Sequence, residues 1–231
     1  MGPLDTLAVG LLAGLLALER KAFLQAMASR PLVAGALIGI VLGKPYVGLS
    51  AGAALELFFL GAVNFGGVLP DNELFATCAT AACACAMARS GGLDSNALLS
   101  ISTLVMLPLA KVGKRADQIC EQVNGKAAGG ALCEGPVRAR LRHNLFGLWL
   151  PFLHAMAITV AAALFGWLLL GPVLSGAPAA VLRALGLAWP AIFIVCAATA
   201  LRSVRTARAG LYGGAAAVAM TALQAFRIFS P

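Results

Sequence analysis

Three polar side chains within or just beyond a long apolar stretch of this sequence are the residues best suited to chemistry. Glu56 lies inside the run 51–62, which holds no other charge. A charge in the middle of a membrane segment costs about 3 kcal/mol, so such a residue usually faces a partner or a cavity. Asn64 offers two donors and an acceptor, which suits a polyol. Asp71, after Pro70, could accept two hydroxyl groups.

Each of these three residues also has a structural interpretation. Glu56 could be satisfied by neighbouring backbone or by another subunit, and Asn64 could cap a broken helix. Asp71 could cap a helix that begins near Asn72, because Asp is a favoured N-cap residue. The residue types therefore predict a site that binds hydroxyl groups, with these structural roles left open.

The sequence shows no motif for covalent catalysis or for the use of ATP. It lacks a P-loop, a Gly-x-Ser-x-Gly element and a deaminase motif, and its two histidines, His143 and His154, cannot build a metal cluster alone. Three of the six cysteines, Cys78, Cys83 and Cys85, lie in an Ala/Thr-rich run, where Cys is usually a small buried hydrophobe. We expect no catalytic residue, no metal and no cofactor.

The elements that must position these side chains are predicted to be membrane helices. The 231-residue chain is 61% hydrophobic and 11% charged, whereas a soluble domain carries about 25% charged residues. This composition excludes ordinary soluble enzymes and nucleic-acid-binding proteins. The apolar runs are continuous and rich in Ala and Leu, unlike the alternating strands of a barrel. At roughly 20 residues per span, the length predicts an all-α polytopic membrane protein with about six to eight membrane-dipping segments.

The segment 31–70 is expected to contain a broken element, because it is too long for one helix. It is interrupted by Pro31, Pro45 and Pro70. Glycines four residues apart let helices approach closely, and for Gly35 and Gly39 we expect plain helix packing. The run 61–71 is too rich in glycine for a stable helix. Non-helical backbone at membrane depth must be buried or line a cavity, so we expect a re-entrant or broken helix, as in many transporter substrate sites.

The net charge of +8 is attributed to basic loops on the cytoplasmic side rather than to nucleic-acid binding. The stretch 111–142 holds seven basic residues and is predicted to be cytoplasmic. Two further groups are predicted on the same side: Arg20, Lys21 and Arg30, and Arg202, Arg205 and Arg208. The segments between them are predicted as helices near 144–170, 187–201 and 209–226, with an outer connection at 171–186 and the N-terminus outside.

The stretch from Arg30 to Gly43 resembles the opening signature of the IIC subunit of mannose/fructose/sorbose-type phosphotransferase systems. The resemblance continues in order and spacing through three further elements of that family. These are Gly-x-x-Leu-Glu ending at Glu56, Leu-Gly-x-x-Asn-x-Gly around Asn64, and Pro-Asp at Asp71. The match is strong over the segment 30–71, and the rest of the chain agrees in length and hydropathy.

The resemblance implies a membrane subunit that moves a hexose or amino sugar inward by an elevator-like motion. Such a subunit pairs with a IID membrane subunit in a hetero-oligomer. Soluble IIA and IIB proteins carry the phosphoryl group to the arriving sugar, so this chain is not expected to be an enzyme itself. By carry-over from the family, Glu56, Asn64 and Asp71 would help to bind the sugar.

The implied organisation is a single integral membrane domain, 1–231, that crosses the bacterial inner membrane several times. It divides into a glycine-rich sugar-site region, 31–110, a cytoplasmic basic stretch, 111–142, and C-terminal helices, 143–231. No nucleic-acid partner is expected. Two alternatives remain at this point: a membrane scaffold or sensor subunit that moves nothing, and an unrelated gradient-driven transporter.

Overall fold

The computed structural model describes residues 1–22, 24–60, 69–134, 137–201 and 214–215, with the backbone alone for 127–134, 137–144 and 146. Every regular element in these residues is helical. In chain order they are α1 (Pro3–Lys21), α2 (Pro31–Val41), α3 (Pro45–Leu60), α4 (Glu73–Ala88), α5 (Ser95–Met106), α6 (Leu109–Glu134), α7 (Val137–Phe165), the π-helical turn η1 (Gly166–Leu170), α8 (Gly171–Ser175) and α9 (Ala179–Leu201). The predicted all-α fold is confirmed.

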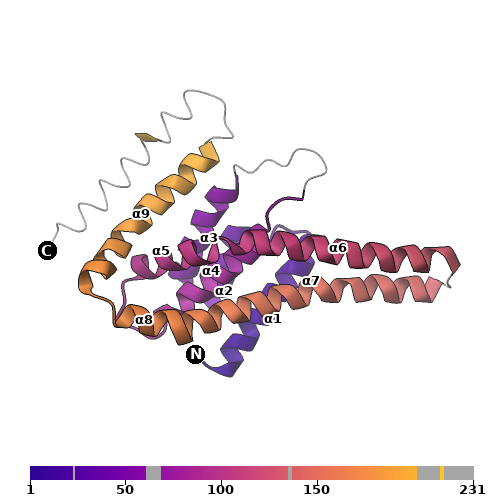
Figure 1. Ribbon diagram of the computed structural model, residues 1–231, viewed down its shortest axis with the longest axis horizontal. Coiled ribbons are helices and arrows are strands. Elements are labelled where there is room, and N and C mark those ends of the chain that lie inside the picture. The colour runs from indigo at the N-terminus through magenta and orange to yellow at the C-terminus, as the bar shows by residue number, and fades with distance from the viewer. Residues whose placement is uncertain (23, 61–68, 135–136, 202–213, 216–231) are drawn as a thin grey trace.

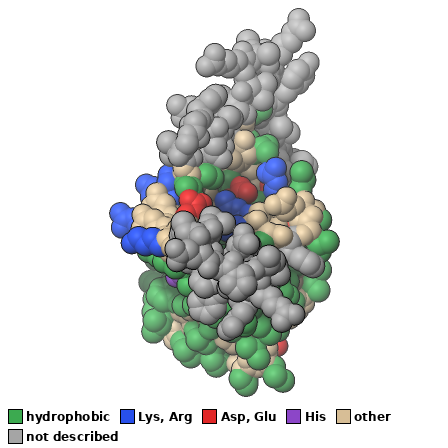
Figure 2. All heavy atoms as spheres, turned by 90° about the vertical axis from the view of Figure 1, so that its right-hand side faces the viewer, with side chains coloured by type: hydrophobic (Ala, Val, Ile, Leu, Met, Phe, Trp, Pro, Cys, Tyr) green, Lys and Arg blue, Asp and Glu red, His purple; other side chains and the backbone are tan. Residues whose placement is uncertain are grey.

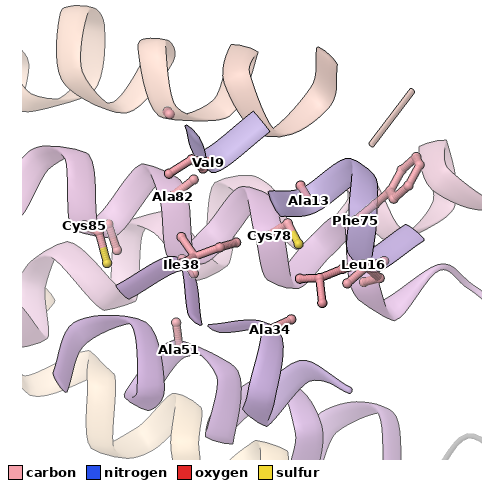
Figure 3. Close-up of a cluster of buried hydrophobic side chains, with 14 of the residues drawn as sticks. Val9, Ala13, Leu16, Ala34, Ile38, Ala51, Phe75, Cys78, Ala82 and Cys85 are labelled. Carbon is pink, nitrogen blue, oxygen red and sulfur yellow. The ribbon is translucent and has the colours of Figure 1, made fainter. Parts of the chain in front are cut away.

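Helix α4 forms the centre of the bundle. Its residues 74–87 are all buried, because Ala, Cys and Thr are small enough for neighbouring helices to pack on every side. Figure 3 shows side chains from α1, α2 and α3, among them Val9, Ile38 and Ala51, gathered with those of α4 in one core cluster. Cys78, Cys83 and Cys85 are buried here, as predicted.

Helices α2 and α3 form a hairpin whose backbones touch. A Cβ atom on Gly35 would lie 2.5 Å from the carbonyl oxygen of Gly48, and one on Gly39 would lie 3.0 Å from the Cα of Gly48. Gly43 ends α2 with a φ of +67°, a conformation that favours glycine at the C-terminus of a helix. The predicted close packing through Gly35 and Gly39 is confirmed.

Two helices of the described chain are long and apolar enough to cross a membrane: Gly147–Ser175 and Ala179–Leu201. Helices α5 and α6 qualify together as a pair bent by 42°. Three shorter apolar helices, α2, α3 and α4, complete the apolar elements. The expected fold class, an all-α membrane protein with spanning and broken helices, is therefore confirmed. The break expected at 61–71 falls mostly on residues 61–68, which lie outside the described residues, and that prediction stays untested.

The chain after residue 108 differs from the expected boundaries. Most of the basic stretch 111–142 is helical, since α6 and the start of α7 lie within it. These two helices lie side by side and extend beyond the rest of the bundle (Figure 1). The expected outer connection 171–186 is also shorter, because α9 begins at Ala179. The helix expected near 209–226 lies outside the described residues except for residues 214–215.

Charged side chains gather at one end of the bundle. Figure 2 faces that end and shows Lys, Arg, Asp and Glu side chains across its middle, with mostly hydrophobic side chains below. Four ion pairs join different elements there: Arg20–Asp117, Lys21–Asp117, Arg30–Glu56 and Lys114–Asp71. At the start of α1, a separate pair joins Asp5 to Arg89 at the end of α4.

Candidate functional site

Glu56 projects from α3 to the first turn of α2. Its Oε2 atom accepts a hydrogen bond from the backbone N–H of Leu32 at 3.3 Å, and its Oε1 atom lies 3.5 Å from a guanidinium nitrogen of Arg30. The first N–H groups of a helix have no partner within it, so this carboxylate supplies one and faces the positive end of the helix dipole. Its side chain remains 22% exposed. Glu56 thus has the backbone and side-chain partners that its structural interpretation requires, and part of its carboxylate is still accessible.

Asp71 lies shortly before α4 with a partly accessible side chain. Its Oδ1 atom is 3.6 Å from the ammonium nitrogen of Lys114, and its side chain is 40% exposed. The hypothesis that Asp71 caps the next helix is wrong, because Asn72 does so through a hydrogen bond from the backbone N–H of Phe75 at 3.1 Å. The carboxylate of Asp71 is therefore not used as a helix cap.

Asn72 uses three of its polar groups within the protein. Besides accepting from Phe75, its amide Nδ2 donates to the carboxylate of Asp117 at 2.8 Å, and its backbone N–H donates to the carbonyl of Ala110 at 3.0 Å. The residue is 2% exposed. These contacts fix the junction between the connection after α3 and the start of α4.

Removing the Asn72 side chain should destabilise the protein. We expect Asn72→Ala to cost about 1–2 kcal/mol, since it removes a helix cap and a charge-assisted hydrogen bond. Asn72→Ser, which keeps a capping oxygen, should recover part of the loss. Thermal unfolding of the detergent-solubilised protein measures both, and an unchanged midpoint for Asn72→Ala would show that these bonds contribute nothing.

Glu56 and Asp71 come from opposite ends of the connection between α3 and α4. Leu55 and Phe59 of α3 pack with Ala76 of α4 and Ala110 of α6 in one buried cluster. This packing places the end of α3 and the start of α4 at the same end of the bundle. Asn64 lies outside the described residues, so its prediction stays untested.

Sequence reasoning missed the ionic cluster beside this junction, which consists of Arg20, Lys21, Asn72 and Asp117. The Asp117 carboxylate is 2.6 Å from the ammonium nitrogen of Lys21 and 3.7 Å from a guanidinium nitrogen of Arg20. Asp117 is 4% exposed, which for a carboxylate requires partners. Asp117 lies in a run dominated by Lys and Arg. Such a run predicts which side of the membrane it faces but not which side chains form ion pairs.

The described groups assembled here can bind a ligand through hydrogen bonds. Carboxylates accept hydrogen bonds from hydroxyl groups, and an amide both donates and accepts. In the described part of the chain, no group of three or more His, Cys, Asp and Glu side chains could hold a metal ion. The arrangement fits recognition of a neutral polyhydroxylated ligand.

Comparisons with known proteins identify a family for this chain. The chain matches the family model described as the sorbose-specific IIC component of the phosphotransferase system over residues 4–224. A relative described as putative N-acetylgalactosamine permease IIC component 2, from Escherichia coli K12, is 35% identical over 74 residues. That match covers 32% of this chain and 55% of the relative, so it spans about half of the relative's length.

Two solved structures share the fold. One, described only as a membrane protein, has a TM-score of 0.69 at 22% identity and covers 99% of this chain and 93% of its own. The other is a cryo-EM structure of the mannose transporter ManYZ in complex with microcin E492 (MceA). It has a TM-score of 0.61 at 21% identity and covers 100% of this chain and 97% of its own.

The family match extends over nearly the whole chain, and the structural likeness extends over all of it. The pattern around Glu56, Asn64 and Asp71 pointed to the same family. This chain belongs to the sorbose-specific IIC component family of the phosphotransferase system.

Proposed function

We propose that this chain is the translocating IIC subunit of a phosphoenolpyruvate-dependent sugar phosphotransferase system. It carries a hexose or amino sugar inward across the bacterial inner membrane, where a IIB protein phosphorylates it. The observation that supports this most is the placement of Glu56 and Asp71. Both carboxylates are partly exposed, and the glycine-rich sequence between them predicts a broken element, the arrangement expected at a transporter's substrate site.

The proposed substrate class follows from the chemistry of the site and from the relatives. The proposed sugar-binding residues are Glu56, Asn64 and Asp71. Their two carboxylates accept hydrogen bonds and their amide both donates and accepts, which suits several hydroxyl groups on one sugar ring. The relatives' names mention N-acetylgalactosamine and mannose, a hexosamine derivative and a hexose. We therefore propose a hexose or amino sugar as substrate, with the choice between them made by site geometry and by the partner subunit.

The proposed orientation places the ion-paired end of the bundle in the cytoplasm. Arg20 and Lys21 end α1 at the same end as Lys114, and Asp5 and Arg89 meet at the opposite end. This distribution fits the positive-inside rule, with the N-terminus outside. The α6–α7 pair, which contains most of the stretch 111–142, then extends on the cytoplasmic side, where phosphocarrier proteins would arrive.

The proposed partners are a IID membrane subunit and soluble IIA and IIB proteins. Exposed apolar side chains such as Leu15, Tyr46 and Val195 are consistent with contact to lipid or to a second membrane subunit. Phosphoryl transfer belongs to the partners in this proposal, and the chain itself contributes binding and movement of the sugar.

Uptake by cells tests this proposal. Cells that lack their own hexose and amino sugar uptake would express the chain with its IID, IIA and IIB partners and receive radiolabelled sugars one at a time. We expect uptake of at least one sugar. A complex that assembles but transports nothing would contradict the proposal and favour a scaffold or sensor role.

The same assay tests Asn64. We expect Asn64→Ala to lower the rate of uptake about tenfold or more, the effect of losing one or two hydrogen bonds to the sugar. Gln118→Ala is the matched control, because it removes another amide from an exposed position on α6. Wild-type uptake by Asn64→Ala would remove Asn64 from the site.

A further inference from the structure

One face of α6 packs along the start of α4. Ala110, Gly113, Lys114 and Asp117 have the spacing that aligns side chains on a single helix face. A Cβ atom on Gly113 would lie 2.6 Å from the Cβ of Asn72 and 2.8 Å from the ring of Phe75. The absence of a side chain at Gly113 therefore lets α6 approach the junction closely enough for its neighbours on that face to reach it.

The contacts along this face follow the chain order of the junction. The carbonyl of Ala110 accepts from the Asn72 backbone N–H at 3.0 Å, Lys114 lies 3.6 Å from Asp71, and Asp117 accepts from the Asn72 amide at 2.8 Å. Thus the face contacts both residues that precede α4. Asp71 is therefore held in two ways: its side chain pairs with Lys114, and the next residue, Asn72, is hydrogen-bonded to α6.

Asp117 connects this face to a third helix. Its buried carboxylate contacts Lys21 and Arg20 at the end of α1 as well as Asn72. A buried carboxylate that contacts two cations and an amide is held in one orientation, because turning it would break an ion pair or a hydrogen bond that water cannot replace. The position of the α4 start relative to α1 and α6 is therefore set through one side chain.

We propose that Lys114 and Asp117 are positioning residues for Asp71. Lys114 orients the Asp71 carboxylate toward the sugar, and Asp117 holds Asn72 so that the end of the connection cannot rotate away. This inference rests on the proposed function and adds two residues to it that do not themselves touch the sugar. A positioned acceptor binds more tightly because the sugar does not have to order it.

A positioning role predicts a change in apparent affinity with little change in maximal rate. We expect Lys114→Gln to raise the KM for uptake about tenfold, because the sugar must then order the Asp71 carboxylate itself, and to leave the maximal rate within about twofold. Lys114→Arg, which keeps the charge, should restore the KM to within about threefold of the wild type. Lys111→Gln is the matched control, because Lys111 is an exposed cation on α6 away from this face.

Asp117→Asn tests the second half of the proposal. Hydrogen exchange of the purified protein should show faster exchange at the backbone amide of Asn72, which is bonded to Ala110, in Asp117→Asn than in Lys111→Gln. If Asp117→Asn does not fold, the Lys114 variants still test the proposal. The Lys114–Asp71 pair is partly exposed, and such pairs contribute little to stability.

The outcomes separate this inference from the proposed function. Absence of uptake by the wild type contradicts the proposed function, and the positioning role falls with it. Wild-type uptake together with an unchanged KM in Lys114→Gln overturns the inference alone. A lower maximal rate at constant KM also overturns it, since that result would mean that Lys114 acts on the movement of the sugar rather than on Asp71.

Discussion

Glu56→Gln should lower sugar uptake about 10- to 100-fold. A hydrogen bond to a charged acceptor contributes about 1.5–3 kcal/mol, and the substitution removes the charge from an acceptor that the sugar is proposed to use. Gln keeps the shape of Glu, and its carbonyl oxygen can still accept from the N–H of Leu32. The Arg30–Glu56 pair is substantially exposed, so its loss should cost about 0–1 kcal/mol of stability. Initial uptake rates, normalised to protein in the membrane, measure the effect.

Arg30→Gln separates the two roles of Glu56. It removes the same ion pair but leaves the carboxylate. Glu56 keeps its hydrogen bond from the N–H of Leu32, which still orients it, so we expect uptake within about threefold of the wild type, as for an exposed pair. Equal losses in Arg30→Gln and Glu56→Gln would show that Glu56 serves only to hold α2 against α3. Wild-type uptake by Glu56→Gln would remove Glu56 from the sugar site.

Gly48→Ala should destabilise the protein by about 2–4 kcal/mol, because the added methyl group has no room. Its Cβ would overlap the carbonyl oxygen of Gly35 and lie 2.6 Å from the Cα of Gly39. Both obstacles are backbone atoms of α2, which cannot turn aside as a flexible side chain can. Helices α2 and α3 would have to separate, and Glu56 would lose its contacts at the start of α2.

Gly125→Ala is the matched control for this prediction. Gly125 lies in α6 with no atom within 4 Å of a built Cβ, so Ala should be neutral or stabilise the helix by about 0.5–1 kcal/mol. The midpoint of thermal unfolding in detergent measures both variants. Equal midpoints for Gly48→Ala and the wild type would contradict the close backbone contact between α2 and α3.

The close helix packing through Gly35 and Gly39 was predictable from the sequence because its cause is local. Glycines four residues apart fall on one helix face whatever the surroundings, and a proline at the start of each helix marks where it begins. The same holds for the cysteines of α4, whose small apolar neighbours indicate burial. The pattern also identified the family through Glu56, Asn64 and Asp71, and the match over residues 4–224 confirms that identification.

Helix capping at the start of α4 was harder to predict. Asp71 and Asn72 are both favoured caps, and sequence preference cannot choose between neighbours. Contacts with a distant element distinguish the two: the backbone N–H of Asn72 donates to Ala110 of α6, and its side chain accepts from the N–H of Phe75. Asp71 is thereby left free of capping, which supports its proposed role with the sugar.

The ionic cluster around Asp117 could not be predicted from sequence patterns. Its members lie on α1, α6 and the residue before α4, and no periodicity relates positions so far apart. The stretch 111–142 is polar and rich in basic residues, so it read as a cytoplasmic segment, whereas α6 uses one face of it for tertiary contacts. The spacing of Ala110, Gly113 and Asp117, which places them on one helix face, is the sequence feature that could have indicated this packing.

Transport into proteoliposomes tests the central claim most directly. Vesicles containing this chain and its IID partner would be loaded with IIA, IIB and a phosphoryl donor, and labelled hexoses and amino sugars would be added outside. We expect one of these sugars to accumulate inside as its phosphate, only when IID is present, and far less with Glu56→Gln. Entry of unmodified sugar into vesicles that contain this chain alone would contradict the account, as would failure of every sugar to enter.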